Sequence, residues 1–297
     1  MRRICVLAAI IVALCSGFDE VSGQSSGVVQ VGGYTYSGDE FVFVLDRSGS
    51  TAWNGQIAGV QGVVTDALAD LEPSQQFSVI AFNGSSLVFS AVLLPATAAN
   101  VLSAQNWVSA LAPLGQTCPV GALEDSFSIL TSSAGEPAIF FFADGAEQCL
   151  GPPAGLIAIA QANVDFIPIH TLVGPTPVTD PDLGEWMLAI ANDSDGSFVD
   201  LTVPIPDPYV RGDANGDGSI NLADAVTILR FGFGLSTGPT CMRAHDVNAD
   251  GVVEAIPDAI ACLELLFVSG TPPLSVPYPD CGSTPPSSLT CEVSDCT

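Results

Sequence analysis

The sequence predicts an α/β protein with a doubly wound, mostly parallel sheet, followed by a small α-helical domain built on two polar loops. Over residues 40–201, short apolar runs alternate with segments whose apolar residues recur at helical spacing. This alternation is typical of strands and crossover helices in a sheet covered on both faces. A Pro-rich linker, residues 202–210, then precedes two similar Asp/Asn/Gly-rich segments, each followed by a short helical pattern.

Six short apolar runs are expected to form strands, and the segments between them to form helices. The expected strands cover residues 40–45, 76–82, 86–92, 138–143, 165–173 and 197–201, with the third at an edge. The expected helices cover residues 55–71, 98–111, 120–130, 156–163 and 183–192. Ligands of such sheets bind at the carboxyl ends of the strands, so the chemistry is expected just after Leu45 and Ala143.

The chain is strongly acidic. Its 297 residues include 32 Asp and Glu against 6 basic residues, all of them Arg, which gives a net charge of -26. Nucleic acids and anionic membranes are recognised by clustered Lys and Arg, so this composition argues against both as partners. It suits divalent cations instead. A general acidic bias, as in proteins from saline surroundings, is the alternative explanation.

The N-terminus has the features of a bacterial Sec-type signal peptide. Arg2 and Arg3 precede a short apolar run, Ile4–Cys15, and small residues follow, which predicts a signal over residues 1–23. Residues 24–39 are rich in Gly, Ser and Gln and are expected to form a flexible leader. No later stretch reaches the about 18 apolar residues of a membrane-spanning helix. We expect a secreted protein, extracellular or at the cell surface, without a transmembrane segment in the mature chain.

The cysteines support export. Two of the nine, Cys5 and Cys15, lie in the expected signal, which leaves seven. Disulfides are typical of exported proteins, and Cys118 and Cys149, the only two in residues 40–201, are expected to pair. The sequence does not define the pairing of the other five, which are Cys241, Cys262, Cys281, Cys291 and Cys296. Because seven is odd, one thiol is free or pairs with another chain. The sequence leaves the oligomeric state open.

Three loops in the first region carry a candidate metal site. Asp46-Arg47-Ser48-Gly49-Ser50 follows the first strand, Gly115-Gln116-Thr117 precedes a helix, and Ala143-Asp144-Gly145 follows the run AIFFF. In order and spacing these loops resemble the metal-ion-dependent adhesion site of von Willebrand factor A domains, which include the integrin inserted domains. The resemblance covers residues 40–201 and implies the Rossmann-like fold of that family.

The candidate ligands fit a hard cation. They are Asp46, Ser48, Ser50, Thr117 and Asp144, and their side chains offer only oxygen atoms, which are the ligands that Mg²⁺ and Mn²⁺ prefer. The resemblance implies that the two serines bind directly, that Thr117 does so in the ligand-bound state, and that the aspartates bind directly or through water. It also implies that an open coordination position takes a carboxylate from a protein partner. The alternative is that Asp46 and the serines only cap a helix and that Asp144 forms a turn.

The second region begins with a loop of EF-hand type. Its expected calcium ligands are Asp213, Asn215, Asp217, Ser219 through its carbonyl, Asn221 and Asp224. Asp at the last position, followed by a single exit helix over residues 225–233, resembles dockerin type I modules. Arg211-Gly212-Asp213 also has the sequence of an integrin-binding tripeptide. Asp213 is expected to bind calcium instead, so we do not expect this tripeptide to act as an integrin ligand.

A second loop departs from this pattern. Its expected ligands are Asp246, Asn248, Asp250, Val252 through its carbonyl, Glu254 and Asp258. The last ligand position falls on Pro257, so Asp258 reaches the ion only across a one-residue insertion, and we expect weaker binding. Asx-rich turns without metal are the alternative for both loops. The expected module covers residues 211–270, and the Cys/Pro-rich extension 271–297 resembles that on dockerin-like repeats of planctomycete secreted proteins.

The motifs favour a binding protein over an enzyme. Of the two histidines, His170 lies in an expected strand and His245 beside a calcium loop, and no catalytic triad, zinc motif or phosphate loop occurs. We expect a secreted, metal-dependent adhesion or protein-binding function, with a calcium-stabilised module for docking or anchoring. A cohesin-like partner is implied by the dockerin resemblance, with a stand-alone anchor or spacer as the alternative. The alternative functions are a structural subunit of an extracellular assembly and an accessory subunit of a secreted enzyme complex.

Overall fold

The computed structural model describes residues 27–131, 135–175, 182–203, 205, 207–239, 241–285, 289–291 and 296. The expected signal peptide lies outside this range, as do residues 24–26 of the expected leader. None of the helices in the described ranges combines the length and the apolar character needed to cross a membrane.

A seven-stranded sheet forms the centre of the larger unit. Its parallel strands are β3 (Glu40–Asp46), β4 (Gln76–Phe82), β7 (Pro137–Phe142), β8 (Ile169–Val173) and β9 (Phe198–Asp200). Two short strands, β5 (Ser86–Val88) and β6 (Leu94–Pro95), pair antiparallel with β4. The order is β5-β4-β3-β7-β8-β9, so the chain winds outward from β3 in both directions. The predicted fold class, a doubly wound and mostly parallel sheet, is confirmed.

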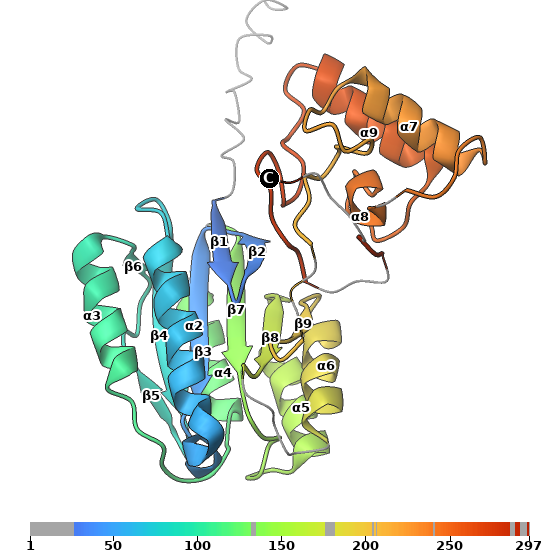
Figure 1. Cartoon of the computed structure of the whole chain (residues 1–297). Coiled ribbons are helices and arrows are strands. Elements are labelled where there is room, and N and C mark those ends of the chain that lie inside the picture. The colour runs from blue at the N-terminus through green and yellow to red at the C-terminus, as the bar shows by residue number, and fades with distance from the viewer. Residues whose placement is uncertain are drawn as a thin grey trace, which may run out of the picture.

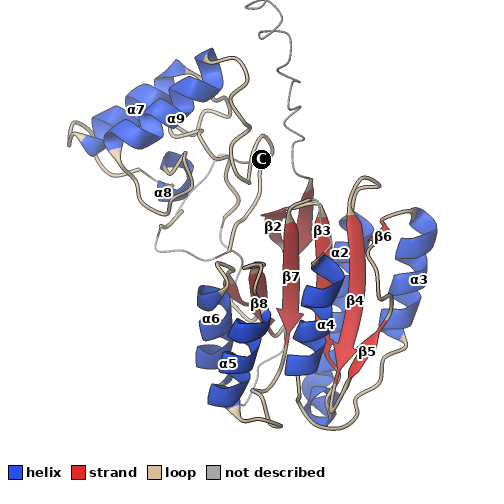
Figure 2. Ribbon diagram, turned by 180° about the vertical axis from the view of Figure 1, so that it is seen from behind, coloured by secondary structure: helices blue, strands red, loops and turns tan. Residues whose placement is uncertain are grey.

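Helices cover both faces of the sheet (Figures 1 and 2). One face carries α2 (Gln56–Asp70) and α3 (Ala98–Ser109), and the other carries α4 (Val120–Leu130), α5 (Pro152–Ala162) and α6 (Leu183–Asp193). A hydrophobic core lies on each face of the sheet, and alternate residues of β7 point into one or the other. Phe140 packs in the core on the α2 side, while Ile139 and Phe141 pack in the core on the α4 side. Because both faces are covered, the central strands are apolar throughout, which is why the sequence shows them as continuous apolar runs.

A hairpin precedes the sheet where a flexible leader was expected. β1 (Val28–Val31) and β2 (Tyr34–Ser37) pair antiparallel around Gly32 and Gly33, whose φ values are +61° and +86°. Val29, Val31, Tyr34 and Tyr36 are buried, and they join the core that β3, β7 and α2 form. The expectation of a flexible leader is therefore wrong for residues 28–37. Alternating apolar residues around two glycines are a hairpin signal that the Gly-rich composition concealed.

In the part of the smaller unit that the structure describes, three helices are present. These are α7 (Leu222–Gly232), α8 (Met242–His245) and α9 (Ala255–Phe267), and α7 and α9 pack on each other around a small core. Helix α7 begins three residues before the expected position 225, because Asn221 and Asp224 form a capping box at its start. Disulfides join Cys241 to Cys291 and Cys281 to Cys296, and Cys262 is a buried free thiol.

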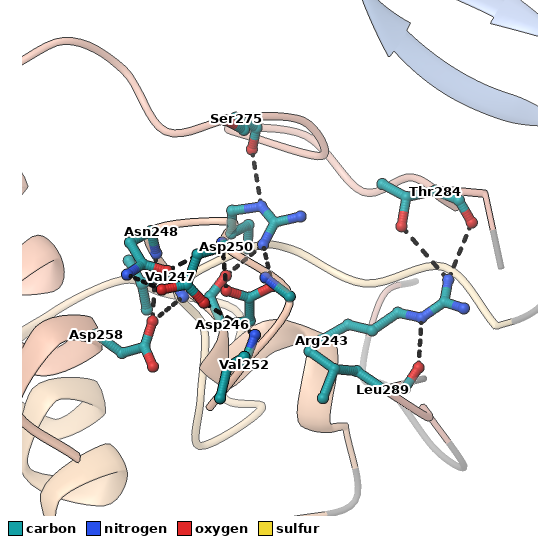
Figure 3. Close-up of polar contacts among 12 residues, drawn as sticks. Arg243, Asp246, Val247, Asn248, Asp250, Val252, Asp258, Ser275, Thr284 and Leu289 are labelled. Atoms are coloured by element: carbon teal, nitrogen blue, oxygen red, sulfur yellow. Dashed lines mark hydrogen bonds and ion pairs between the residues drawn. The ribbon is translucent and has the colours of Figure 1, made fainter. Parts of the chain in front are cut away.

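The C-terminal extension connects the two units. The amide of Thr35 in β2 donates to the carbonyl of Ser283 (2.7 Å), and Tyr209 and Gly282 exchange backbone hydrogen bonds. Arg243 of α8 donates to the carbonyls of Thr284 and Leu289, each at 2.9 Å (Figure 3). The smaller unit thus lies beyond the end of the sheet where β3 and β7 begin (Figures 1 and 2).

Candidate functional site

Three loops meet at the opposite end of the sheet, where β3 and β7 end. Asp46 is the last residue of β3, and Asp144 follows β7 by two residues. The second loop, which holds Thr117, lies between α3 and α4. Its Gly115 carbonyl accepts the amide of Gly49 (2.9 Å), and its Leu114 amide donates to the carbonyl of Arg47 (2.8 Å). These backbone bonds hold the first and second loops against each other.

Four of the five expected metal ligands are linked by hydrogen bonds. The carboxylate of Asp46 accepts the amide of Ser48 (2.7 Å), and the hydroxyls of Ser48 and Ser50 lie 2.9 Å apart. The Ser50 hydroxyl then donates to Oδ1 of Asp144 (2.8 Å), which is 94 residues away in the sequence. Oxygen donors from the first and third loops are therefore in direct contact.

The fifth expected ligand, Thr117, is buried on the second loop. Among the described residues, its side-chain hydroxyl has no hydrogen-bond partner, and neither has Oδ2 of Asp46. Both residues are at most 2% exposed. A buried oxygen without a partner is unfavourable by about 1–3 kcal/mol, and native proteins rarely tolerate one without a function. Asp46 belongs to the hydrogen-bonded group of oxygens, and Thr117 stands on the loop whose Gly115 carbonyl accepts the amide of Gly49. Unpartnered buried oxygens on these two loops fit a site for a hard cation such as Mg²⁺.

The electrostatics of the cluster also fit a cation. Burial, and then the nearby Asp144 carboxylate, raise the pKa of Asp46 above its ordinary value. Burial likewise raises the pKa of Asp144. Two ionised carboxylates that are close together and shielded from water repel each other. A divalent cation bound between them would offset this electrostatic repulsion.

Helix capping does not account for these side chains. Ser48 stands at the N-cap of the short 3-10 helix η1 (Gly49–Gly55) but makes no side-chain capping bond, and the N-cap of α2 is Gly55. The serine hydroxyls are directed to each other and to Asp144 instead. The alternative of a simple cap is therefore not supported.

A disulfide joins the second and third loops. Cys118 and Cys149 are bridged as expected, and the amide of Gln148 donates to the carbonyl of Thr117 (2.9 Å). Sequence reasoning missed Glu147, which is 2% exposed and whose Oε1 accepts the amides of Cys149 (2.5 Å) and Leu150 (3.1 Å). These bonds fold the third loop back on itself. The signal available in the sequence was an acidic residue two positions before a bridged cysteine.

The first calcium-type loop is folded around its own carboxylates. Asp213 accepts the amides of Asp217 (3.1 Å) and Gly218 (2.9 Å). Asp224, from the first turn of α7, accepts the amides of Asn215 (3.0 Å) and Asn221 (2.8 Å). Gly218 has a φ of +80°, which turns the chain sharply at the position where such loops need glycine.

The second loop repeats this arrangement despite its insertion (Figure 3). Asp246 accepts the amides of Asp250 (3.1 Å) and Gly251 (3.2 Å), as Asp213 does in the first loop. Asp258 accepts the amides of Asn248 (3.3 Å) and Glu254 (2.7 Å), as Asp224 does. Asp258 is the fourth residue of α9, whereas Asp224 is the third of α7. The extra residue is absorbed in the first turn of the helix, and the carboxylate still reaches the loop.

Arg211 distinguishes the second loop from the first. Its guanidinium forms an ion pair with Asp246 (3.5 Å) and donates to the carbonyl of Ser275 (3.1 Å). Burial raises the pKa of Asp246, and Arg211 opposes that effect. Arg211 is 6% exposed, so the tripeptide Arg211-Gly212-Asp213 is not presented to solvent. The positive charge beside Asp246 supports the expectation that this loop binds a cation less tightly than the first.

His170 belongs to the core of the sheet. Its ring lies against those of Tyr36 (4.6 Å between centroids) and Phe140 (5.3 Å), and its Nδ1 pairs with the hydroxyl of Ser197 (2.9 Å). Burial lowers the pKa of His170 to about 4. It is therefore neutral near pH 7 and packed as a core residue.

Acid is expected to destabilise the larger unit through His170. Between pH 6.5 and about 4 the unfolded chain binds a proton at this residue and the folded chain does not, so stability falls as pH falls through that window, by at most about 3 kcal/mol. Urea unfolding at pH 7 and pH 4.5 checks this against His170→Gln, which cannot titrate. The wild type should lose more stability than the variant, and an equal loss in both would contradict the assignment.

Comparison with known proteins defines the class of each unit. The larger unit has the fold of von Willebrand factor A domains: a von Willebrand factor type A protein from Catenulispora acidiphila superposes with a TM-score of 0.50 and 18% sequence identity, over 59% of this chain and 42% of that one. Residues 211–259 match the model of the Dockerin type I domain.

Two further relatives match parts of the chain. Human inter-alpha-trypsin inhibitor heavy chain H4 is 32% identical over 101 residues, which are 34% of this chain and 11% of that protein. The pilus adhesin SpaC from Lactobacillus rhamnosus GG, in its open conformation, superposes with a TM-score of 0.46 and 16% identity over 59% of this chain and 29% of that one. The chain thus spans about a tenth of the curated relative and less than half of these solved structures.

Proposed function

We propose that this chain is a secreted, metal-dependent protein-binding protein of the adhesion type. The proposal rests on the chain of contacts from Asp46 through Ser48 and Ser50 to Asp144, together with the buried, unpartnered hydroxyl of Thr117 on the second loop. The six paired cysteines support export, because disulfides are typical of exported proteins.

The five oxygen residues of the three loops would hold Mg²⁺ or Mn²⁺. Three of them, Ser48, Ser50 and Thr117, are neutral, so only Asp46 and Asp144 offset the charge of the ion. When bound, the ion supplies an electrophilic position for a carboxylate of a protein partner. The protein's own part is to hold the donors in place, which the backbone bonds between the loops and the Cys118–Cys149 bridge do.

The smaller unit is proposed to bind calcium in both loops and to dock or anchor the chain. Its ligands in the first loop are Asp213, Asn215, Asp217, Ser219, Asn221 and Asp224, and those in the second are Asp246, Asn248, Asp250, Val252, Glu254 and Asp258. Matching turns of α7 and α9 expose apolar pairs, Leu222 with Val226 and Ile256 with Ile260. These duplicated apolar faces support docking to a cohesin-like protein.

A second candidate function, a structural or accessory subunit of an extracellular assembly, is supported by the placement of the two units. The metal loops and the helices α7 and α9 lie at opposite ends of the molecule (Figure 1). One chain can therefore hold a carboxylate-bearing partner and a docking partner at the same time. Both candidates are binding roles, and the packing of His170 inside the core agrees with the proposal that this histidine is not a catalytic base.

Loss of Asp144 is expected to remove one Mg²⁺-binding event. In calorimetric titration of the full chain, Asp144→Ala should bind Mg²⁺ at the adhesion-type site at least tenfold more weakly than the wild type. Asp66→Ala, which removes an exposed carboxylate from α2, is the matched control and should bind like the wild type. Identical isotherms for the three proteins would contradict the proposed site.

Thr117→Val tests the same site by a different readout. The valine replaces an unpartnered buried hydroxyl with a methyl group of similar shape, so the metal-free protein should lose no stability, while its Mg²⁺ affinity should fall. A variant that is less stable without metal and binds Mg²⁺ normally would mean that Thr117 has only a structural role.

A further inference from the structure

We infer that the partner captured at the metal site presents its carboxylate between large apolar side chains, and that Trp53, Leu114 and Leu150 determine this specificity. The inference rests on the proposed function, because it names the class of partner for the same site. These three residues are called the apolar rim below.

Each residue of the apolar rim comes from a different metal loop. Trp53 follows Ser50 by three residues, Leu114 directly precedes Gly115, and Leu150 directly follows Cys149. Their side chains are 74%, 62% and 55% exposed, respectively. Other large apolar side chains of this unit are also exposed, such as Leu102 (58%) and Phe166 (78%). The rim residues differ from these because one stands on each of the three loops of the proposed site, and such a grouping points to a surface that a partner covers.

Backbone contacts fix the positions of the rim. The amide of Leu114 donates to the carbonyl of Arg47 (2.8 Å), beside the first two ligands. The amide of Leu150 donates to Glu147 (3.1 Å), and its neighbour Cys149 is bridged to Cys118, which follows Thr117. Trp53 lies in η1, where Asn54 takes a left-handed conformation (φ +52°) and turns the chain into α2. Each residue of the rim therefore stands on backbone that is tied to one of the ligand loops.

Charge restricts the partner further. The chain has a net charge of -26, so a partner rich in acidic residues is repelled at long range. A bound divalent ion balances Asp46 and Asp144 but leaves no excess of positive charge to attract a run of carboxylates. The site therefore favours a single carboxylate, and the apolar rim supplies the contacts around it. In protein interfaces a few buried anchor side chains, often Trp, carry most of the affinity, and the residues around them exclude water.

The partner class is tested by selection from a peptide library displayed on phage, with a fixed central Glu and random residues on both sides. The full chain is used as bait in Mg²⁺, and bound phage are eluted with EDTA. The inference predicts enrichment of Leu, Ile, Phe, Met or Trp next to the Glu. Enrichment of further Asp or Glu, enrichment of polar flanks, or no EDTA-eluted binders from a chain that binds Mg²⁺ would overturn it.

Variants assign the effect to the rim. Trp53→Ser, Leu114→Ser and Leu150→Ser should each weaken binding of a synthetic peptide of the selected sequence by about tenfold or more, with unchanged Mg²⁺ affinity. Leu102→Ser, which removes an exposed apolar side chain from α3 (58% exposed), is the matched control and should bind like the wild type. Normal peptide binding by all three rim variants overturns the inference and leaves the proposed function intact. Absence of Mg²⁺ binding in the wild type would overturn both.

Discussion

Removal of calcium with EGTA is expected to unfold the smaller unit while the larger unit stays folded. The smaller unit has two small cores in the described residues: Ala225, Ile228, Val247, Ala259 and Cys262 form one, and Tyr209, Cys241 and Ala244 form the other. Cores of this size stabilise little by themselves, so bound ions are expected to contribute most of the folding free energy. Without an ion the clustered carboxylates also repel one another: Asp213 and Asp217 add to the effect of burial in raising the pKa of Asp224.

Hydrogen exchange measured by mass spectrometry checks this prediction segment by segment. Peptides from α7 and α9 should lose most of their protection in EGTA and regain it with added Ca²⁺, and peptides from α2 should not change. Asp224→Asn and Asp258→Asn assign the effect to each loop, with Asp193→Asn on the exposed end of α6 as control. Full protection of α7 and α9 in EGTA would show that the disulfides and the helix packing suffice without the ion.

Phe140→Ala is expected to destabilise the larger unit by about 3–5 kcal/mol, which is the range for deleting a buried phenylalanine ring. Phe140 is completely buried at the centre of β7. Its ring contacts Tyr36 (4.8 Å between centroids), Phe43 (5.3 Å) and His170 (5.3 Å). The deleted ring would therefore leave a cavity between the sheet, the N-terminal hairpin and α2, where several neighbours lose their contacts together.

Urea unfolding followed by tryptophan fluorescence measures this loss. The protein has three tryptophans, Trp53, Trp107 and Trp186, all within the larger unit, so the signal does not report on the smaller one. Leu102→Ala on the exposed face of α3 is the control and should change stability by no more than about 0.5 kcal/mol. A Phe140→Ala effect no larger than that of the control would contradict the packing described for this core.

Local patterns were enough to predict the fold and the convergence of the loops. The apolar runs that became β3 and β7 end directly before Asp46 and Asp144, so the position of each motif at a strand end could be read from the sequence. The helix over residues 120–130 has the bounds that were expected. The strand expected over 165–173 begins only at Ile169, because Phe166 has a positive φ and Pro168 precedes the strand.

Contacts between distant residues could not be predicted in this way. The hydrogen bond from Thr35 to Ser283 and those from Arg243 to Thr284 and Leu289 depend on how the two units meet, not on any local periodicity. The same holds for the pairing of Cys241 with Cys291 and for the burial of Glu147 beside the third loop. The place of Asp258 was uncertain because the first turn of α9 had to absorb an extra residue.

The central claim is that three loops bring five oxygen donors around one divalent ion. Anomalous diffraction from crystals of the full chain grown with Mn²⁺ tests it most directly. A peak about 2 Å from the hydroxyls of Ser48 and Ser50, on the side of the Thr117 hydroxyl, is the expected result. Mn²⁺ found only in the loops of residues 211–270, or Ser48, Thr117 and Asp144 too far apart to share an ion, would contradict the claim.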